Sequence, residues 1–250
     1  MSTESSGAGD VHRSMALMWQ EPAGADAGRD ARLSLDRIVD TAIGVADADG
    51  LEAVSMRRVA AELGVGTMSL YRYVPGKDEL LDLMLDRVNL GEVRAPFPTD
   101  WRAALERYAR ETWELYRRHP WLPFVDQSRP LLGPNALAGL EALLTGLSGT
   151  DVEHRQQILA ITTLEGFVAS LARTVNGAMI AEQRTGVSTE EFWQAQEPVL
   201  VSAMASGRFP VLAGLDMEAF GAGPEESFEF GLRVVLDGLV GVFGNPESPR

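Results

Sequence analysis

Residues 55–77 read SMRRVAAELGVGTMSLYRYVPGK, and the first half of this stretch has the pattern of a short amphipathic helix. Its apolar residues recur at the i, i+3, i+4 and i+7 spacing of one helical face. They are Met56, Val59, Ala60 and Leu63. Ser55 stands where a helix N-cap is expected, and Gly64 stands where a glycine can end a helix in the left-handed conformation. The pattern therefore predicts a helix that begins after Ser55 and ends before Gly64.

The second half of the stretch predicts another short helix directly after the turn. This helix can begin near Thr67 and run to about Tyr73, because Pro75 and Gly76 then end it. Two short helices with such a tight connection are the outline of a helix-turn-helix, whose second helix enters the major groove of DNA.

The charge of residues 55–77 agrees with a DNA-binding role. Four basic residues stand against Glu62 alone, which gives the stretch a net charge of +3. They are Arg57, Arg58, Arg72 and Lys77. The whole chain carries −14, which by itself argues against a nucleic-acid binder. Exposed charges farther apart than a Debye length of ~8 Å are largely screened, so the local cluster is the better guide.

The segment from Leu33 to Val88 resembles the N-terminal domain of the TetR family of bacterial one-component transcriptional repressors. The matching pieces are GLEAVSMRRVAAELGVG from residue 50, SLYRYV from residue 69 and KDELL from residue 77. Near the C-terminus, FEFGLRVVLDGL at 228–239 is similar to the effector domains of the branch nearest the tetracycline repressor. The resemblance implies an all-α homodimer that binds a double-stranded, palindromic DNA operator and leaves it when a small molecule binds.

Candidate DNA contacts lie on the second helix of the motif and at the starts of its two neighbours. Thr67, Met68 and Ser69 occupy the first turn of the second helix, where side chains reach base edges in this geometry. Hydroxyls and charges suited to phosphate oxygens surround them. These belong to Ser55, Arg57, Tyr71, Arg72, Tyr73 and Lys77. The two tyrosines can instead pack the small domain. The resemblance places Arg57, Thr67, Met68, Ser69, Tyr71, Tyr73 and Lys77 at DNA-contacting positions.

Composition excludes several other kinds of site. The 250-residue chain has no cysteine, which excludes disulfides, zinc–thiolate sites and thiol catalysis. Its three histidines are scattered, and neither a nucleophile elbow nor a Walker loop occurs, so we expect no catalytic site, no metal and no cofactor. The first residues lack the apolar core of a secretory signal, and charges interrupt the most apolar stretches. We therefore expect a soluble cytoplasmic protein without a membrane span.

The chain divides into three expected parts. Residues 1–30 are rich in Ser, Gly, Ala and charge, which predicts a disordered tail. The alternative is an arm that touches DNA or docks on the body, with Arg29 and Arg32 nearest the duplex. Residues 31–79 form the expected helix-turn-helix domain, and 80–250 the expected helical effector-binding and dimerisation domain. Apolar spacing predicts helices at 34–47, 77–88, 101–118, 119–127, 134–147, 151–184, 189–206 and 225–243, with a loop-like segment at 207–224.

Two of these helices, at 151–184 and 225–243, are apolar on more than one face. On the first, a second stripe rich in small side chains runs beside the apolar one. It contains Leu159, Thr163, Gly166, Ser170 and Thr174. A helix that is apolar nearly all round must be buried on all sides, and a second copy of the chain would bury it. The helix at 77–88 joins the two domains, so it can carry motion from one to the other.

Aromatic and polar side chains of the C-terminal part are the candidate ligand contacts. They are Trp113, Tyr116, Trp121, Phe124, Phe167, Asn176 and Trp193. Ligand pockets are mostly apolar with a few placed polar groups, although any one of these aromatics can instead be ordinary core. The expected effector is an apolar or aromatic small molecule with at least one polar group. Two alternatives stay open: a ligand-independent DNA-binding protein with a solid core, and a helical enzyme with an incidental helix-turn-helix.

Overall fold

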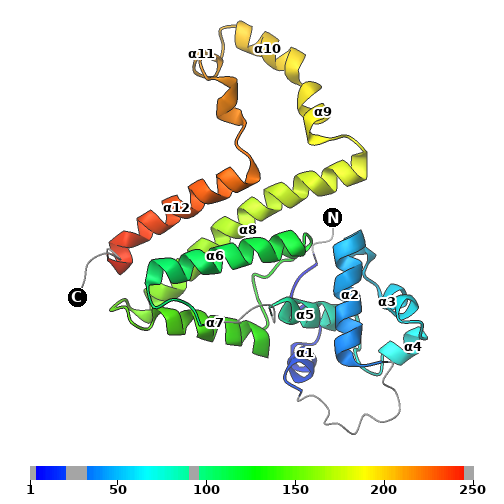
Figure 1. Cartoon of the computed structure of the whole chain (residues 1–250). Coiled ribbons are helices and arrows are strands. Elements are labelled where there is room, and N and C mark those ends of the chain that lie inside the picture. Colours follow the sequence, from blue (N-terminus) through cyan, green and yellow to red (C-terminus); the bar gives the residue numbers. More distant parts are fainter. Residues whose placement is uncertain (1–3, 21–32, 90–95, 245–250) are drawn as a thin grey trace.

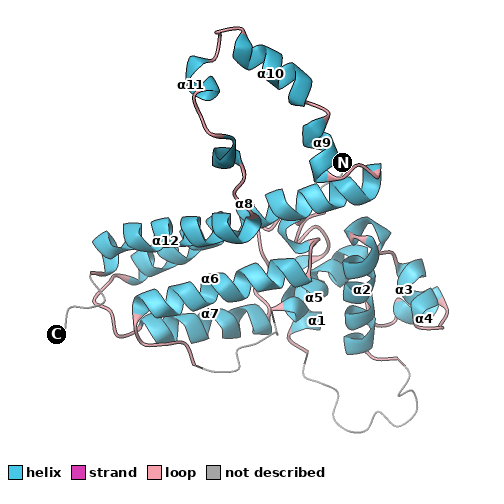
Figure 2. Ribbon diagram, turned by 45° about the horizontal axis from the view of Figure 1, so that its top comes forward, coloured by secondary structure: helices cyan, strands magenta, loops and turns pink. Residues whose placement is uncertain are grey.

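The computed structural model describes residues 4–20, 33–89 and 96–244 (Figure 1). In these ranges the regular structure is helical, apart from one isolated β-bridge between Ser5 and Asp126, and the expected all-α fold is confirmed (Figure 2). The α-helices are α1 (Val11–Met18), α2 (Leu35–Asp49), α3 (Met56–Glu62), α4 (Thr67–Leu70), α5 (Lys77–Val88), α6 (Trp101–Arg118), α7 (Pro134–Leu147), α8 (His154–Thr185), α9 (Thr189–Gln194), α10 (Glu197–Ala205), α11 (Pro210–Ala213) and α12 (Pro224–Phe243). Short 3₁₀ turns are η1 (Leu51–Ala53), η2 (Leu122–Phe124) and η3 (Met217–Phe220).

Helices α2 to α5 pack round one apolar core at one end of the molecule, where α3 and α4 form the outer edge (Figure 1). The core includes Ile38, Val39, Ala42, Met56, Val59, Leu70, Val74, Leu80, Leu81 and Met84. The Ser34 hydroxyl starts α2 by accepting from the backbone N–H of Arg37 at 3.2 Å. Helices as short as α3 and α4 are not stable alone, so this shared core holds them in place.

Helices α6, α7, α8 and α12 form a second core, which is held by stacked aromatic rings. Trp113 of α6 stacks on Phe228 of α12 at 5.0 Å between ring centroids, and Trp101 stacks on Phe243 at 4.9 Å. Helix α6 therefore lies along α12 over most of its length, and α8 runs beside both (Figure 2).

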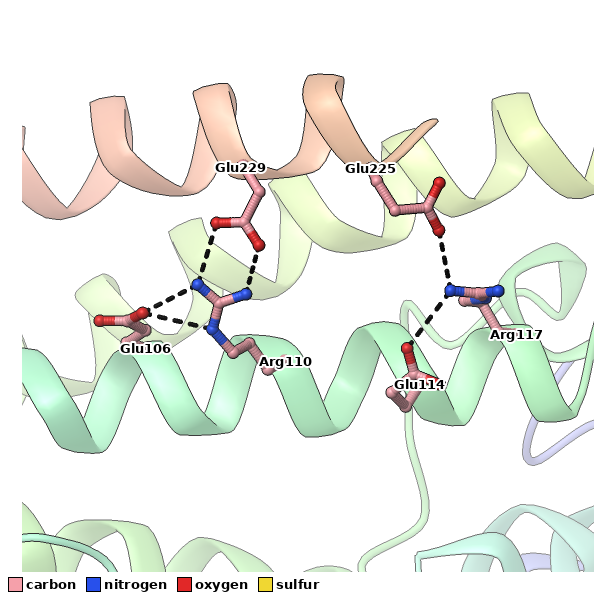
Figure 3. A network of polar contacts seen from close by, with 6 residues as sticks. All are labelled: Glu106, Arg110, Glu114, Arg117, Glu225 and Glu229. Atoms are coloured by element: carbon pink, nitrogen blue, oxygen red, sulfur yellow. Dashed lines mark hydrogen bonds and ion pairs between the residues drawn. The ribbon is translucent and has the colours of Figure 1, made fainter. Parts of the chain in front are cut away.

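Ion pairs across the outer surface also join α6 to α12 (Figure 3). Arg110 donates to Glu106 on its own helix and to Glu229 on α12. Arg117 donates to Glu225 of α12 at 2.8 Å. The hydrogen bond from Arg110 lowers the pKa of Glu229. These pairs are largely exposed, so they fix the register of the two helices more than they stabilise the fold.

Prolines account for two departures from the expected helices. The helix expected at 119–127 is wrong: only η2 forms there, because Pro120 and Pro123 lack the N–H that a helix needs. The helix expected at 189–206 is two helices, α9 and α10, and Pro198 stands in the first turn of α10. The segment 207–224 holds α11 and η3 within its loops. Together α9 to η3 form an arm that projects from the body (Figure 2).

The disorder expected for residues 1–30 is wrong for residues 4–20. Helix α1 forms there, with Met18 buried and with Met15 and Leu17 packed against the core of α2 to α5. Composition alone predicted a solvated tail, because Met18 has its apolar neighbours far away in the sequence. Residues 1–3 and 21–32, which include Arg29 and Arg32, lie outside the described residues.

Candidate DNA-binding surface and effector region

The turn between α3 and α4 is closed by two backbone hydrogen bonds. The N–H of Val65 donates to the carbonyl of Ala60 at 3.0 Å, and the N–H of Gly64 donates to that of Ala61 at 3.1 Å. This is a Schellman motif, and Gly64 has the positive φ of 68° that it requires. At the other end of α3 the hydroxyl of Ser55 accepts from the N–H of Arg58 at 3.2 Å. The predicted start and stop of this helix are confirmed.

Helix α4 faces outward with the residues expected to meet base edges. Leu70 is fully buried, whereas Met68 is 77% exposed and Thr67 and Ser69 are partly exposed. The regular helix ends at Leu70, and residues 71–73 continue as a turn in which the N–H of Tyr73 donates to the carbonyl of Leu70 at 2.8 Å. The early end follows from the approach of Pro75, which cannot continue a helix.

The expected phosphate contacts differ in their surroundings. Arg57, Tyr71 and Arg72 are exposed, whereas Tyr73 is half-buried against the core, as its packing alternative predicts. Lys77 starts α5 and its ammonium pairs with the carboxylate of Glu4 at 2.7 Å. The guanidinium of Arg58, a member of the basic cluster, pairs with Asp49 at 3.0 Å and Glu62 at 2.8 Å.

Two carboxylates of the DNA-binding end reach the C-terminal part. Asp86 of α5 is buried and accepts from the backbone N–H groups of Asn135 and Ala136 in the first turn of α7, at 3.2 and 3.1 Å. Asp47 of α2 accepts from the indole N–H of Trp121 at 2.7 Å and lies 2.8 Å from Nδ1 of His119. Helices α2 and α5 are therefore tied to different segments of the C-terminal part.

Among the seven expected ligand contacts, Trp113 and Phe167 lie in the packed core against α12. Trp113 is 4% exposed, and the Phe167 ring lies 6.2 Å from that of Phe228. A Cβ on Gly231 would lie 2.2 Å from the Phe167 ring, so the two helices are in close contact there.

Tyr116, Phe124 and Asn176 are brought together where α6, η2 and α8 meet. The amide of Asn176 donates to the carbonyls of Tyr116 and Pro120 at 3.0 and 3.2 Å. The Phe124 ring is 40% exposed and lies beside Gly177 of α8. This group is the part of the predicted ligand site that the fold assembles.

Trp121 and Trp193 lie apart from that group. Trp121 is buried beside α2, bound to Asp47, and Trp193 is 58% exposed on the projecting arm, with its ring 5.5 Å from that of Phe192. Surface hollows of about 450 and 280 Å³ lie beside residues 126–131 and between α7 and α8, and none of the seven side chains lines either hollow.

Family profiles match both ends of the chain. Residues 38–84 match bacterial regulatory proteins of the tetR family, and residues 95–242 match the tetracyclin repressor-like C-terminal domain. The HTH-type transcriptional repressor DrrR1 of Streptomyces coeruleorubidus is 52% identical over 241 residues, which cover 95% of this chain and 88% of that protein. The chain belongs to the TetR family.

Solved structures of another member show the same fold with ligands bound. ActR of Streptomyces coelicolor in complex with actinorhodin is 29% identical, with a TM-score of 0.70 over 86% of this chain and 99% of that one. Its complex with (S)-DNPA is 30% identical, with a TM-score of 0.66 over 84% and 98%. The class E tetracycline repressor of Escherichia coli is 26% identical over 84% of this chain and 92% of that protein. This TetR-family protein is thus a transcriptional repressor of the ligand-responsive kind.

Sequence reasoning missed one polar contact in this TetR-family effector region. The hydroxyl of Tyr108 on α6 donates to a carboxylate oxygen of Glu165 on α8. Burial, followed by the charge of Glu165, raises the pKa of Tyr108 and raises that of Tyr116 to about 12. A phenol is already protonated at neutral pH, and the raised pKa keeps both hydroxyls as hydrogen-bond donors at more alkaline pH as well. Tyr108, Thr112 and Tyr116 are spaced by four residues and so share one face of α6, and this spacing could have indicated a polar stripe there.

Proposed function

We propose that this repressor binds a palindromic operator as a homodimer, in the cytoplasm, and leaves it when a small molecule binds where α6, η2 and α8 meet. The observation that carries the proposal is α4, with Leu70 anchored in the core and Met68 exposed at the tip of the DNA-binding end. Thr67 and Ser69 flank Met68 and supply the hydroxyls for base edges, while Met68 suits a thymine methyl. A regulator of this kind needs no catalytic site.

Support for the homodimer comes from the outer faces of α8 and α12. Leu159 on α8 is 55% exposed, and Phe230 and Val234 on α12 are 61% and 52% exposed. Gly166 and Gly238 have open space where a Cβ would stand, so another helix could approach closely on this face. Exposed apolar side chains gathered on two neighbouring helices favour an interaction site. We assign this surface to contact with a second copy of the chain. The recognition helix α4 of each copy then meets one half-site of the operator, and the two half-sites lie about 34–36 Å apart or a multiple of that distance.

Helix α8 is long and apolar enough to cross a membrane by length and composition, with 28% of its most apolar window buried. Its partly buried Glu165 and the arginines at 155, 173 and 184 favour a protein partner over lipid. The dimer would bury the apolar residues that make the helix look like a membrane span.

The effector region has both the donors and the apolar surface that a ligand of the proposed class needs. Phe124 offers an exposed ring and Tyr116 a protonated phenol, and Asn176 joins the end of α6 to Pro120, just before η2. ActR, in the same family, is found in complex with actinorhodin. We infer an apolar or aromatic effector with at least one polar group. The other four expected contacts lie away from this group, so the proposed effector region does not include them.

Ligand binding would reach DNA through the contacts that join the domains. An effector that moves η2 moves Trp121 and so Asp47 of α2, and one that tilts α7 moves Asp86 of α5. Either shift changes the spacing of the two recognition helices. A ligand causes release only if it binds the DNA-incompetent spacing more tightly, and such coupling is typically ~1–3 kcal/mol.

The test begins with selection of duplexes from a random pool by the full-length protein. We expect an inverted repeat to be enriched. Thr67→Ala and Ser69→Ala should change which bases are enriched, whereas Thr145→Ala, an exposed hydroxyl on α7, should not. Absence of any enriched duplex would overturn the proposal.

The second arm of the test is release of the selected duplex by actinorhodin and, separately, by tetracycline. Release by either probe at a concentration that rises in Phe124→Ala, with unchanged DNA affinity in its absence, supports the proposed effector region. Release that is the same in Phe124→Ala and wild type would move the site elsewhere. If neither probe releases the selected duplex, the result counts against an effector of the actinorhodin or tetracycline kind and favours the ligand-independent DNA-binding protein.

A further inference from the structure

Residues 4–19, here called the N-terminal clasp, are bound to α5 mainly at the buried carboxylate of Asp82, and Glu79 also accepts from the N–H of Asp10 at 3.4 Å. Asp82 is 1% exposed and accepts from the hydroxyl of Ser14 at 2.7 Å, from the N–H of Gly7 at 2.8 Å and from the hydroxyl of Ser6 at 3.3 Å. A buried carboxylate is costly unless it is hydrogen-bonded, so these three donors and Asp82 stabilise one another.

The N-terminal clasp is also bound to the C-terminal part of the chain. The N–H of Ser6 donates to the carbonyl of Asp126 at 2.9 Å, and the N–H of Asp126 donates to the carbonyl of Glu4 at 3.0 Å. At its other end the indole of Trp19 donates to the carbonyl of Leu132 at 3.3 Å. The clasp therefore spans α5 on one side and the 126–132 segment on the other.

Two glycines allow this close approach. Gly7 has a φ of +67°, a conformation that other residues rarely adopt. A Cβ on Gly9 would lie 3.1 Å from Asp78 Cβ and from Glu79 Oε1, closer than ordinary contact. The backbone thus lies directly on the first turn of α5.

This docking brings Glu4 to the ammonium of Lys77. Their charged atoms are 2.7 Å apart, and the two side chains are 28% and 30% exposed. Under the proposed function, Lys77 binds an operator phosphate, and the Glu4 carboxylate takes up one of the three N–H donors of its ammonium and offsets part of its charge. We propose that the N-terminal clasp is autoinhibitory: it holds Glu4 on Lys77, so that a carboxylate competes with the DNA backbone for the Lys77 ammonium and repels the phosphate.

The consequence is an operator affinity that Glu4 lowers. Displacing a partly exposed ion pair costs little, and the freed carboxylate is then repelled by nearby phosphates. We expect removal of the Glu4 charge to tighten DNA binding by about two- to five-fold, a range set by the typical strength of such pairs.

The experiment compares Glu4→Gln with wild type in the full-length chain, using the duplex that the wild-type protein selects from the random pool. Glu52→Gln is the matched control, because it removes one exposed negative charge from the same end of the molecule. We expect Glu4→Gln to bind the duplex about two- to five-fold more tightly and Glu52→Gln to stay within two-fold of wild type. The same comparison in a Lys77→Met background should show no gain from Glu4→Gln.

Three results would overturn the inference, which rests on the proposed function. Equal affinity of wild type and Glu4→Gln for a selected duplex contradicts the autoinhibitory role of the clasp but leaves the proposed function standing. So does a gain that persists in the Lys77→Met background or is matched by Glu52→Gln, since it would be a general charge effect. Failure of the wild-type protein to select any duplex overturns the proposed function, and this inference with it.

Discussion

Replacing Asp86 by alanine removes a helix cap that crosses between the two parts of the molecule. The carboxylate accepts from the N–H of Asn135 at 3.2 Å, the side-chain amide of Asn135 at 2.9 Å and the N–H of Ala136 at 3.1 Å. A Cβ on Gly133 would lie 2.3 Å from Asp86 Cγ, so the start of α7 is fitted closely round this side chain. Asp86→Ala leaves two N–H groups of α7 without their acceptor.

The magnitude follows from these contacts. Loss of an N-cap acceptor costs about 0.5–2 kcal/mol, and loss of a negative charge at a helix N-terminus costs about 0.3–1 kcal/mol. The side-chain amide of Asn135 loses a partner worth about 1 kcal/mol. Because relief of a buried charge offsets part of this sum, we expect the free energy of unfolding to fall by about 2–3 kcal/mol. For a chain of this size that corresponds to a melting temperature lower by roughly 5–10 °C.

The assay is urea and thermal unfolding of Asp86→Ala beside two comparison variants. Asp86→Asn keeps an acceptor of the same shape and should lose only about 1 kcal/mol. Asp100→Ala removes an exposed cap within α6, where Asp100 accepts from the N–H of Ala103 at 2.8 Å, and should also cost about 1 kcal/mol. A loss for Asp86→Ala no larger than that for Asp100→Ala would refute the cap between α5 and α7.

Three further changes test other parts of the structure. Val234→Glu should convert the dimer to monomer in sedimentation at micromolar concentration, whereas Leu132→Glu, at a comparably exposed site outside α8 and α12, should not; a dimer that survives Val234→Glu would exclude the proposed interface. Gly64→Ala should lower the unfolding free energy by about 1–2 kcal/mol, because φ at this turn is +68°; unchanged stability would mean that the turn relaxes freely. Arg110→Ala should cost less than about 1 kcal/mol in urea unfolding, since its pairs with α12 are exposed; a larger cost would show that the network of Figure 3 stabilises the fold.

Local pattern was enough to predict the helix-turn-helix. The N-cap at Ser55, the glycine at Gly64 and the apolar spacing between them act within a few residues of one another, and the backbone bonds at Ala60 and Val65 complete the same turn. The apolar face of α5 was predicted for the same reason, and Leu80, Leu81 and Met84 are buried.

The polar contacts between distant segments could not be predicted in this way. Local pattern gives no reason to bury Asp82 or Asp86, yet both are buried because their donors come from residues 6–14 and 135–136. The ligand site stays a prediction: of its seven residues, Tyr116, Phe124 and Asn176 meet in the fold, while the others have different neighbours. Aromatic composition shows that side chains are available for a site, but the crossing of α6 and α8 decides which of them converge.

The most direct test of the repressor is the stoichiometry of its complex with the selected duplex, measured by native mass spectrometry. Two recognition helices that meet successive major grooves require two chains on one inverted repeat. We predict a complex of two chains per duplex, which is lost when one half-site is scrambled. A complex of one chain per duplex, or one indifferent to the second half-site, would contradict the account.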